Sequence, residues 1–228
     1  MTAVLTPGRR RVAGLCLILA PLAFTASELA FPETNGTTTD MLDALAASPA
    51  TTTLAIAAMG LTTVLFMPAM LGLLAITPAR GSALTSWGAG LFGFGLIGTA
   101  GLYGANVMMF AMSQPQFDHA LMAQVVDSAS PGLAVPMLGG HWIMVVGALL
   151  LGIGLWRAEA GPRWAAVCVG LCGIADTVLS LLPASELLGA VISEGAMIAG
   201  FGAYGWYVLR ENHRATTSVV PAEIAAVN

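Results

Sequence analysis

The sequence predicts an all-α membrane protein, a bundle of six transmembrane helices with both termini in the cytoplasm. Its composition indicates a membrane protein, because 57% of the 228 residues are hydrophobic and only 9% are charged, whereas soluble domains average about 25% charged residues. Six apolar segments also reach the roughly 20 residues that a helix needs to cross a bilayer. These predicted spans are residues 11–31, 51–77, 84–112, 136–156, 163–183 and 187–209.

The first predicted span, residues 11–31, follows Arg9, Arg10 and Arg11, a pattern that is also typical of a signal peptide. Its apolar run is longer than the roughly 7 to 15 residues of a signal peptide, and no clear small-x-small cleavage site follows it. We therefore predict a first helix that stays in the protein.

The segment between the first two spans, residues 32–50, contains a pattern of its own. Thr39 and Asp40 precede a mainly apolar stretch that ends before Pro49. This arrangement predicts a short capped helix on the outer side of the membrane.

The second outer segment, residues 113–135, has apolar residues at a spacing of four, namely Phe117, Leu121 and Val125. Such a stripe is compatible with an amphipathic helix that lies on the membrane surface as a lid. An ordinary structured loop is the alternative for both outer segments.

The third and sixth spans, residues 84–112 and 187–209, are rich in small residues. Small residues let helix backbones approach closely in lipid, so we predict that these two spans form the tightly packed centre of the bundle. The glycines that recur at every third position of the third span are Gly95, Gly98, Gly101 and Gly104.

The second half of the chain has short connections. The fourth span begins raggedly at Pro136, and a tight turn at residues 183–186 separates the last two spans. We treat residues 1–210 as a single transmembrane domain and predict that residues 211–228 form a flexible cytoplasmic tail.

The basic residues set the predicted orientation. If both termini lie in the cytoplasm, every basic residue of the chain falls on the cytoplasmic side, as the positive-inside rule requires. We therefore expect a multi-pass protein of a bacterial-type cytoplasmic membrane. The basic residues are Arg9, Arg10, Arg11, Arg80, Arg157, Arg163, Arg210 and Arg214.

Several classes of chemistry lack their sequence patterns. Cys16, Cys168 and Cys172 all fall inside predicted spans, where free cysteines act as small apolar packing residues. His141 is the one histidine within the spans, and the sequence has no His-x-x-x-His or Cys-x-x-Cys pattern. It also has no Gly-x-Ser-x-Gly motif and no Walker A motif. We expect no metal, no cofactor and no nucleic-acid partner.

Polar side chains within the predicted spans gather in the half of the membrane opposite the arginines. An ionisable group near the middle of a span costs about 2.5 to 3.5 kcal/mol on insertion scales. Glu194 and Asp176 lie deep in their spans and should therefore face a partner or a wet cavity. Glu28 and His141 could instead be solvated at helix ends, and Glu194 could act only as helix glue. The candidate ligand-binding residues are Glu194, Asp176, His141, Asn106, Glu28 and Tyr103.

A family resemblance rests on three short motifs: the Arg-Arg-Arg-Val-Ala-Gly start at residues 9–14, Pro162-Arg163-Trp164 at the start of the fifth span, and Glu194 as the single Glu of the last span. Together with the six spans and a short Asp-containing outer segment, these motifs resemble bacterial integral membrane proteins grouped as domain of unknown function 4386. The resemblance covers nearly the whole chain. It implies a six-helix bundle and no known activity, and His141 and Asp176 match no position of that pattern.

The leading functional hypothesis is a non-enzymatic membrane protein whose outward-facing acidic pocket binds or moves a small cation, a proton or a lipophilic molecule. One alternative is an intramembrane enzyme in which Glu194 and Asp176 act as acid and base on a lipid-soluble substrate. The other is an accessory subunit of a membrane complex, whose polar residues only hold the bundle together.

Overall fold

The computed structural model describes the backbone of residues 6–32, 36–78, 80–179 and 186–217. Side chains are described for these residues except 99, 102, 129–138, 176–179, 186–190 and 211–217. Within this part of the chain all regular structure is helical. The helices are α1 (Pro7–Ala30), α2 (Thr38–Ala47), α3 (Pro49–Ile76), α4 (Ser82–Met112), α5 (His119–Ala158), α6 (Arg163–Leu179) and α7 (Glu186–Thr217).

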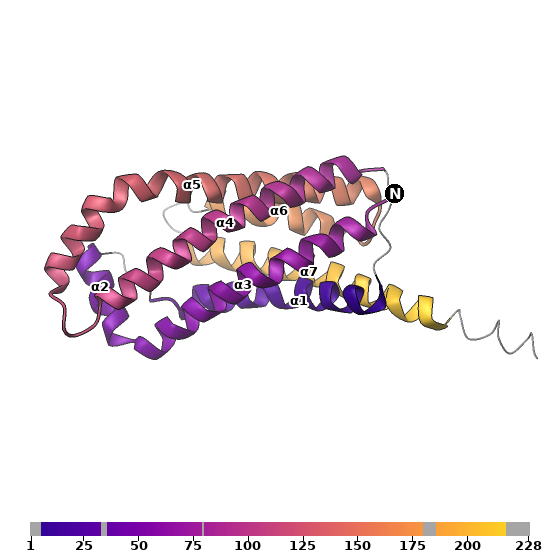
Figure 1. Ribbon diagram of the computed structural model, residues 1–228. Helices are drawn as coiled ribbons and strands as arrows, with labels where there is room; N and C mark the ends of the chain where they lie inside the picture. The colour runs from indigo at the N-terminus through magenta and orange to yellow at the C-terminus, as the bar shows by residue number, and fades with distance from the viewer. Residues whose placement is uncertain (1–5, 33–35, 79, 180–185, 218–228) are drawn as a thin grey trace, which may run out of the picture.

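Six of these helices are long and lie side by side, and the short α2 covers one end of the bundle (Figure 1). Among the described residues, four stretches are long and apolar enough to cross a membrane: α1, α3, α4, and Gly139–Ala158 of α5. The apolar helix Arg163–Ala175 in α6 is shorter. The four apolar helices indicate a membrane protein.

The outer surface of the bundle supports this conclusion. Large apolar side chains point away from the core, as with Val64 (67% exposed), Ile97 (60%) and Leu71 (62%). So many large exposed apolar side chains are unusual for a soluble monomer and suit a surface in contact with lipid.

The helix starts follow local rules. Pro7 and Pro49 stand at the first positions of α1 and α3, where a missing N–H costs no hydrogen bond. The predicted outer helix exists as α2, but its cap is Thr37 rather than Thr39 or Asp40. Thr37 accepts a hydrogen bond from the backbone N–H of Asp40, and the Asp40 carboxylate accepts one from the N–H of Thr37.

From His119 onward, the second outer segment is the first part of α5, a continuous helix of 40 residues. Asp118 caps it by accepting hydrogen bonds from the N–H groups of Ala120 and Leu121. The expected apolar stripe of Phe117, Leu121 and Val125 is exposed. The opposite side of this turn contributes the buried Ala123, which packs with Leu42 and Leu45 of α2.

Glycine contacts determine which helices approach most closely, and here one prediction is wrong. The glycine-rich α4 packs against α5, whereas α7 packs against α1 and α6. A Cβ atom on Gly98 would lie 2.7 Å from the Cα of Gly140 in α5, but one on Gly101 or Gly104 would meet no atom within 4 Å. The third and sixth predicted spans are each tightly packed, but against different neighbours.

The charges are segregated along the bundle. The start of α1, the α3–α4 and α5–α6 connections and the end of α7 lie at one end (Figure 1), which we call the arginine end because every arginine with a described side chain lies there. The opposite end, which we call the acid end, carries α2 and the start of α5. Its exposed carboxylates are Asp40, Asp43, Asp118 and Asp127.

Candidate ligand-binding cavity

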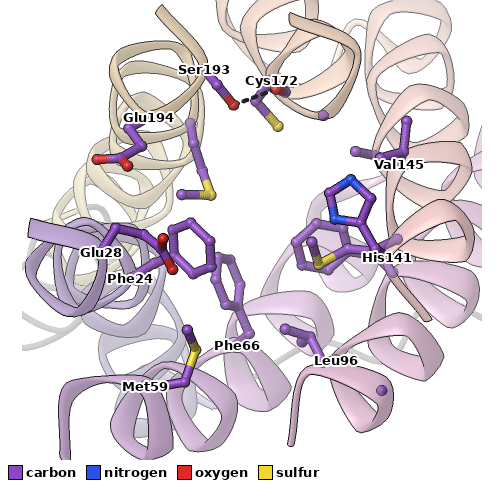
Figure 2. Close-up of a pocket in the computed structure, with 16 residues that line it drawn as sticks. Phe24, Glu28, Met59, Phe66, Leu96, His141, Val145, Cys172, Ser193 and Glu194 are labelled. Carbon is purple, nitrogen blue, oxygen red and sulfur yellow. Dashed lines mark hydrogen bonds between the residues drawn. The ribbon is translucent and has the colours of Figure 1, made fainter. Parts of the chain in front are cut away.

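A cavity of about 260 Å³ lies between the six long helices. Each of these helices contributes lining residues, so the cavity is central to the bundle (Figure 2). Most of the lining is apolar, and the polar side chains are few. The residues are Phe24, Glu28, Met59, Phe66, Phe92, Leu96, Gly98, His141, Met144, Val145, Ala148, Cys172, Gly173, Ser193, Glu194 and Met197.

Three phenylalanines close the cavity toward the arginine end. The ring centroid of Phe66 lies 5.1 Å from that of Phe92 and 5.3 Å from that of Phe201, and both pairs have edge-on geometry. Phe201 is fully buried and precedes Arg210 by nine positions, roughly 13 Å along α7. The cavity therefore lies on the acid-end side of this aromatic layer.

The ionisable groups of the cavity come from three helices. Glu28 of α1 and Glu194 of α7 lie on one side, and the imidazole of His141 from α5 faces them from the opposite side (Figure 2). Glu194 and His141 are half-buried, and Glu28 is exposed. Three residues that the sequence places at a similar depth are thus brought to one cavity.

A hydrogen bond between α6 and α7 fixes the position of the segment that carries Glu194. The hydroxyl group of Ser193 donates to the carbonyl oxygen of Cys172. The thiol of Cys172 donates to the carbonyl oxygen of Val169, 3.2 Å away, and Cys172 itself is buried. Cys172 is thus a packing residue, as its sequence context predicts, and it also lines the cavity.

The remaining walls are aromatic and thioether side chains. Phe24, Phe66 and Phe92 present rings, and Met59 and Met197 present flexible polarizable side chains. Aromatic faces attract cations through their quadrupole, and methionine adapts to ligands of irregular shape. These residues are not predicted from the sequence, because each one alone resembles an ordinary core residue. Their common depth on neighbouring helices was the available signal.

Two other predicted site residues, Tyr103 and Asn106, are not among the described lining residues of this cavity. Tyr103 of α4 packs beside α3, where a Cβ atom on Gly60 would lie 3.4 Å from its ring. Asn106 lies nearer the acid end of α4 and is half-buried. Asp176 belongs to α6, one turn beyond Gly173, but its side chain lies outside the described part of the chain.

The described residues contain no group of three or more His, Cys, Asp or Glu side chains that could hold a metal ion. The cavity in its described extent therefore presents two carboxylates and one imidazole within an apolar wall, which is a chemistry for recognising positive charge on an apolar body.

Comparisons with known proteins give no further indication, because no family model, curated protein or solved structure matches the chain. The resemblance to domain of unknown function 4386 stays a prediction.

Proposed function

We propose that this protein is a six-span protein of the cytoplasmic membrane that binds a small lipophilic cation in its central cavity. The ligand class is an amine or other organic cation with an apolar body. Separate observations support the membrane topology and the binding chemistry.

The topology is supported by α6 and α7, which run alongside the four apolar helices. α7 has 32 residues, roughly 48 Å at 1.5 Å per residue, which exceeds the roughly 30 Å hydrocarbon thickness of a bilayer. Six crossings and a cytoplasmic arginine end would satisfy the positive-inside rule for the whole chain. Both termini then lie in the cytoplasm, and the cavity belongs to the outer half of the membrane.

The binding chemistry rests mainly on the position of Glu28 and Glu194, which lie on one side of a mainly apolar cavity (Figure 2). The sequence contains no lysine, and no arginine belongs to the described lining. His141 is then the one basic side chain of the described lining. A cation that enters the cavity would add positive charge next to the carboxyl groups of Glu28 and Glu194, while the rings of Phe24, Phe66 and Phe92 would contact its apolar body. A cavity of this kind favours binding over a purely structural role, since residues that only join helices leave no space between them.

The enzymatic alternative uses the same cavity. His141 opposite the two carboxylates would place a proton donor and a proton acceptor on opposite sides of a lipid-soluble substrate (Figure 2). Turnover of a bound lipophile that is lost in His141→Gln would favour this alternative.

The test compares two probes of similar shape, cationic 2-phenylethylamine and neutral 2-phenylethanol, on protein in phosphatidylcholine nanodiscs. Ligand-observed NMR should show stronger binding of the amine. Glu194→Gln removes a charge-assisted hydrogen bond worth about 1.5–3 kcal/mol, so the Kd for the amine should rise about 10- to 150-fold.

The matched control is Glu159→Gln, the same substitution at a carboxylate on the arginine end, where Glu159 pairs with Arg163 and is 60% exposed. It should leave the Kd unchanged. Equal binding of both probes, or equal effects of the two substitutions, would refute a cation site.

A further inference from the structure

A second apolar pocket lies on the outside of the bundle and shares no residue with the central cavity. It is a groove of about 230 Å³ between α5 and α6. Polar atoms contribute almost nothing to its surface. Its lining residues are Leu149, Gly152, Ile153, Trp156, Ala166, Val167, Gly170 and Leu171.

The groove exists because two glycines bring the helix backbones together. A Cβ atom on Gly152 would lie 2.6 Å from the Cα of Gly170, so position 152 has no room for a larger residue while the helices keep this separation. A Cβ atom on Gly170 would lie 3.6 Å from the Cα of Gly152, which is an ordinary contact. The side chains on both sides of the crossing then form the walls of a furrow. Ile153, Val167 and Leu171 are exposed along it.

A positively charged side chain, that of Arg163, lies at one end of the groove. Trp156 lines its arginine end, and the guanidinium carbon of Arg163 lies 5.7 Å from the Trp156 ring centroid. Arg163 donates one hydrogen bond to Glu159, and both side chains of this pair are 60% exposed. A guanidinium has five N–H donors, and exposed pairs of this kind are weak. Arg157, the residue after Trp156, is also exposed at the arginine end.

We propose that this groove binds one anionic phospholipid, with an acyl chain between Leu149 and Trp156 and the phosphate on Arg163. The assignment rests on chemical complementarity. The apolar groove matches an acyl chain, and the arginine at its end matches the phosphate. Trp156 and Leu149 are seven positions apart, roughly 10 Å along the helix, so the furrow holds the part of the chain nearest the headgroup.

This inference depends on the membrane placement within the proposed function and not on the ligand of the central cavity. With the arginine end in the cytoplasm, the site faces the leaflet that carries anionic lipid in most cells. Failure of amine binding in the cavity would leave the lipid site untouched, and the reverse also holds.

Native mass spectrometry of the detergent-purified protein tests the site. Phosphatidylglycerol and phosphatidylcholine with identical acyl chains are added in equal amounts, and the retained adducts are counted. The first phosphatidylglycerol should bind several-fold more strongly than phosphatidylcholine. Arg163→Gln should lower its retention roughly fivefold, the effect of about one arginine near an anionic lipid. Glycerol 1-phosphate should not compete, because it lacks the chain that fills the groove.

The matched control is Arg210→Gln. The guanidinium carbon of Arg210 also lies over a tryptophan at the arginine end, 5.4 Å from the ring centroid of Trp206, but neither residue lines the groove. This variant should keep the preference for phosphatidylglycerol. Val167→Trp, at an exposed wall position, should reduce the retention of both lipids by filling the furrow while the lipid-free Tm stays near that of the parent.

Three outcomes would overturn the assignment. Equal retention of both phospholipids would show that the charge has no role. Equal losses in Arg163→Gln and Arg210→Gln would show a general attraction of the arginine end. A dimer that Val167→Trp dissociates, with lipid retention unchanged, would show that a second copy of the chain covers the groove.

Discussion

His119 connects three helices at the acid end. Its Nδ1 lies 2.6 Å from Oδ1 of Asp43 in α2, and its Nε2 lies 3.0 Å from the carbonyl oxygen of Ser113, which follows α4. Both partners are acceptors, so both ring nitrogens must carry a proton if both hydrogen bonds form. The hydrogen bond to Asp43, together with the smaller effects of Ser113 and nearby Asp118, raises the pKa of His119 above its usual 6.5.

This arrangement predicts a pH dependence. A raised pKa in the folded state means that the imidazolium stabilises the fold below the unfolded-state pKa, and that this contribution is lost as the pH rises through the folded-state pKa. The Tm should therefore fall over a pH series that begins below 6.5 and passes above the pKa of His119. Hydrogen bonds with the backbone and hydroxyl groups of Thr37 hold the pKa of the nearby Asp40 carboxyl below its usual value, so Asp40 does not titrate in that range.

Asp43→Asn isolates the effect, because asparagine still accepts a hydrogen bond from Nδ1 but carries no charge. The rest of the sequence, His141 in the cavity included, is unchanged in this variant. The variant should show a flatter dependence of Tm on pH. If the Tm of Asp43→Asn depends on pH as steeply as that of the parent, the titration of His119 is not the cause of the pH dependence.

At the same scale, sequence reasoning selected the right kinds of residue for the cavity but could not fix their places. Glu28, His141 and Glu194 meet at the cavity, because charged side chains deep in a span need a common partner or solvent. Tyr103 and Asn106 do not, since depth counted along each helix assumes that all helices stand upright. A helix that is longer than the thickness of the bilayer tilts instead. The tilt of α4 cannot be predicted from its sequence.

At the scale of helices, the sequence predicts which segments are helical but not which helices pack against each other. The span predicted at 84–112 is α4 at Ser82–Met112, and the one predicted at 51–77 is α3 at Pro49–Ile76. The stripe of glycines in α4 predicts a close approach but does not name the helix that approaches. The fourth predicted span, residues 136–156, lies within α5, which begins already at His119.

The contact between α4 and α5 separates two similar substitutions. Gly98→Leu would force a side chain into the backbone of Gly140, and overpacking of this kind typically costs about 1–3 kcal/mol. Gly101→Leu, three positions further along, points into open space and should have little effect. The Tm of the detergent-solubilised protein should fall in the first variant only. Equal Tm values would show that α4 does not pack against α5 through Gly98.

For the whole molecule, the separation of charge is the strongest sequence-level signal of orientation. The arginines with described side chains lie at one end of the bundle, and α2 with its carboxylates lies at the other (Figure 1). Apolar composition identifies a membrane protein, and only the arginines distinguish its two ends. The central cavity was predictable as a polar region in the acid-end half. Its volume and the aromatic layer that closes it depend on side-chain packing between six helices, which the hydrophobic periodicity of the sequence does not encode.

The proposed orientation predicts opposite labelling of the two ends in intact cells. Arg157→Cys, at the end of α5, and Asp127→Cys, in its first part, both replace exposed side chains on the same helix, which removes differences in helix placement between them. Cys16, Cys168 and Cys172 are first replaced by alanine so that no other thiol reacts. A membrane-impermeant maleimide should label position 127 and spare position 157, and both should react once the membrane is permeabilised.

Because seven arginines remain after Arg157→Cys, the charge asymmetry that sets the orientation is retained. Labelling of position 157 from outside would reverse the topology, placing the cavity in the cytoplasmic half and the α5–α6 groove in the outer leaflet.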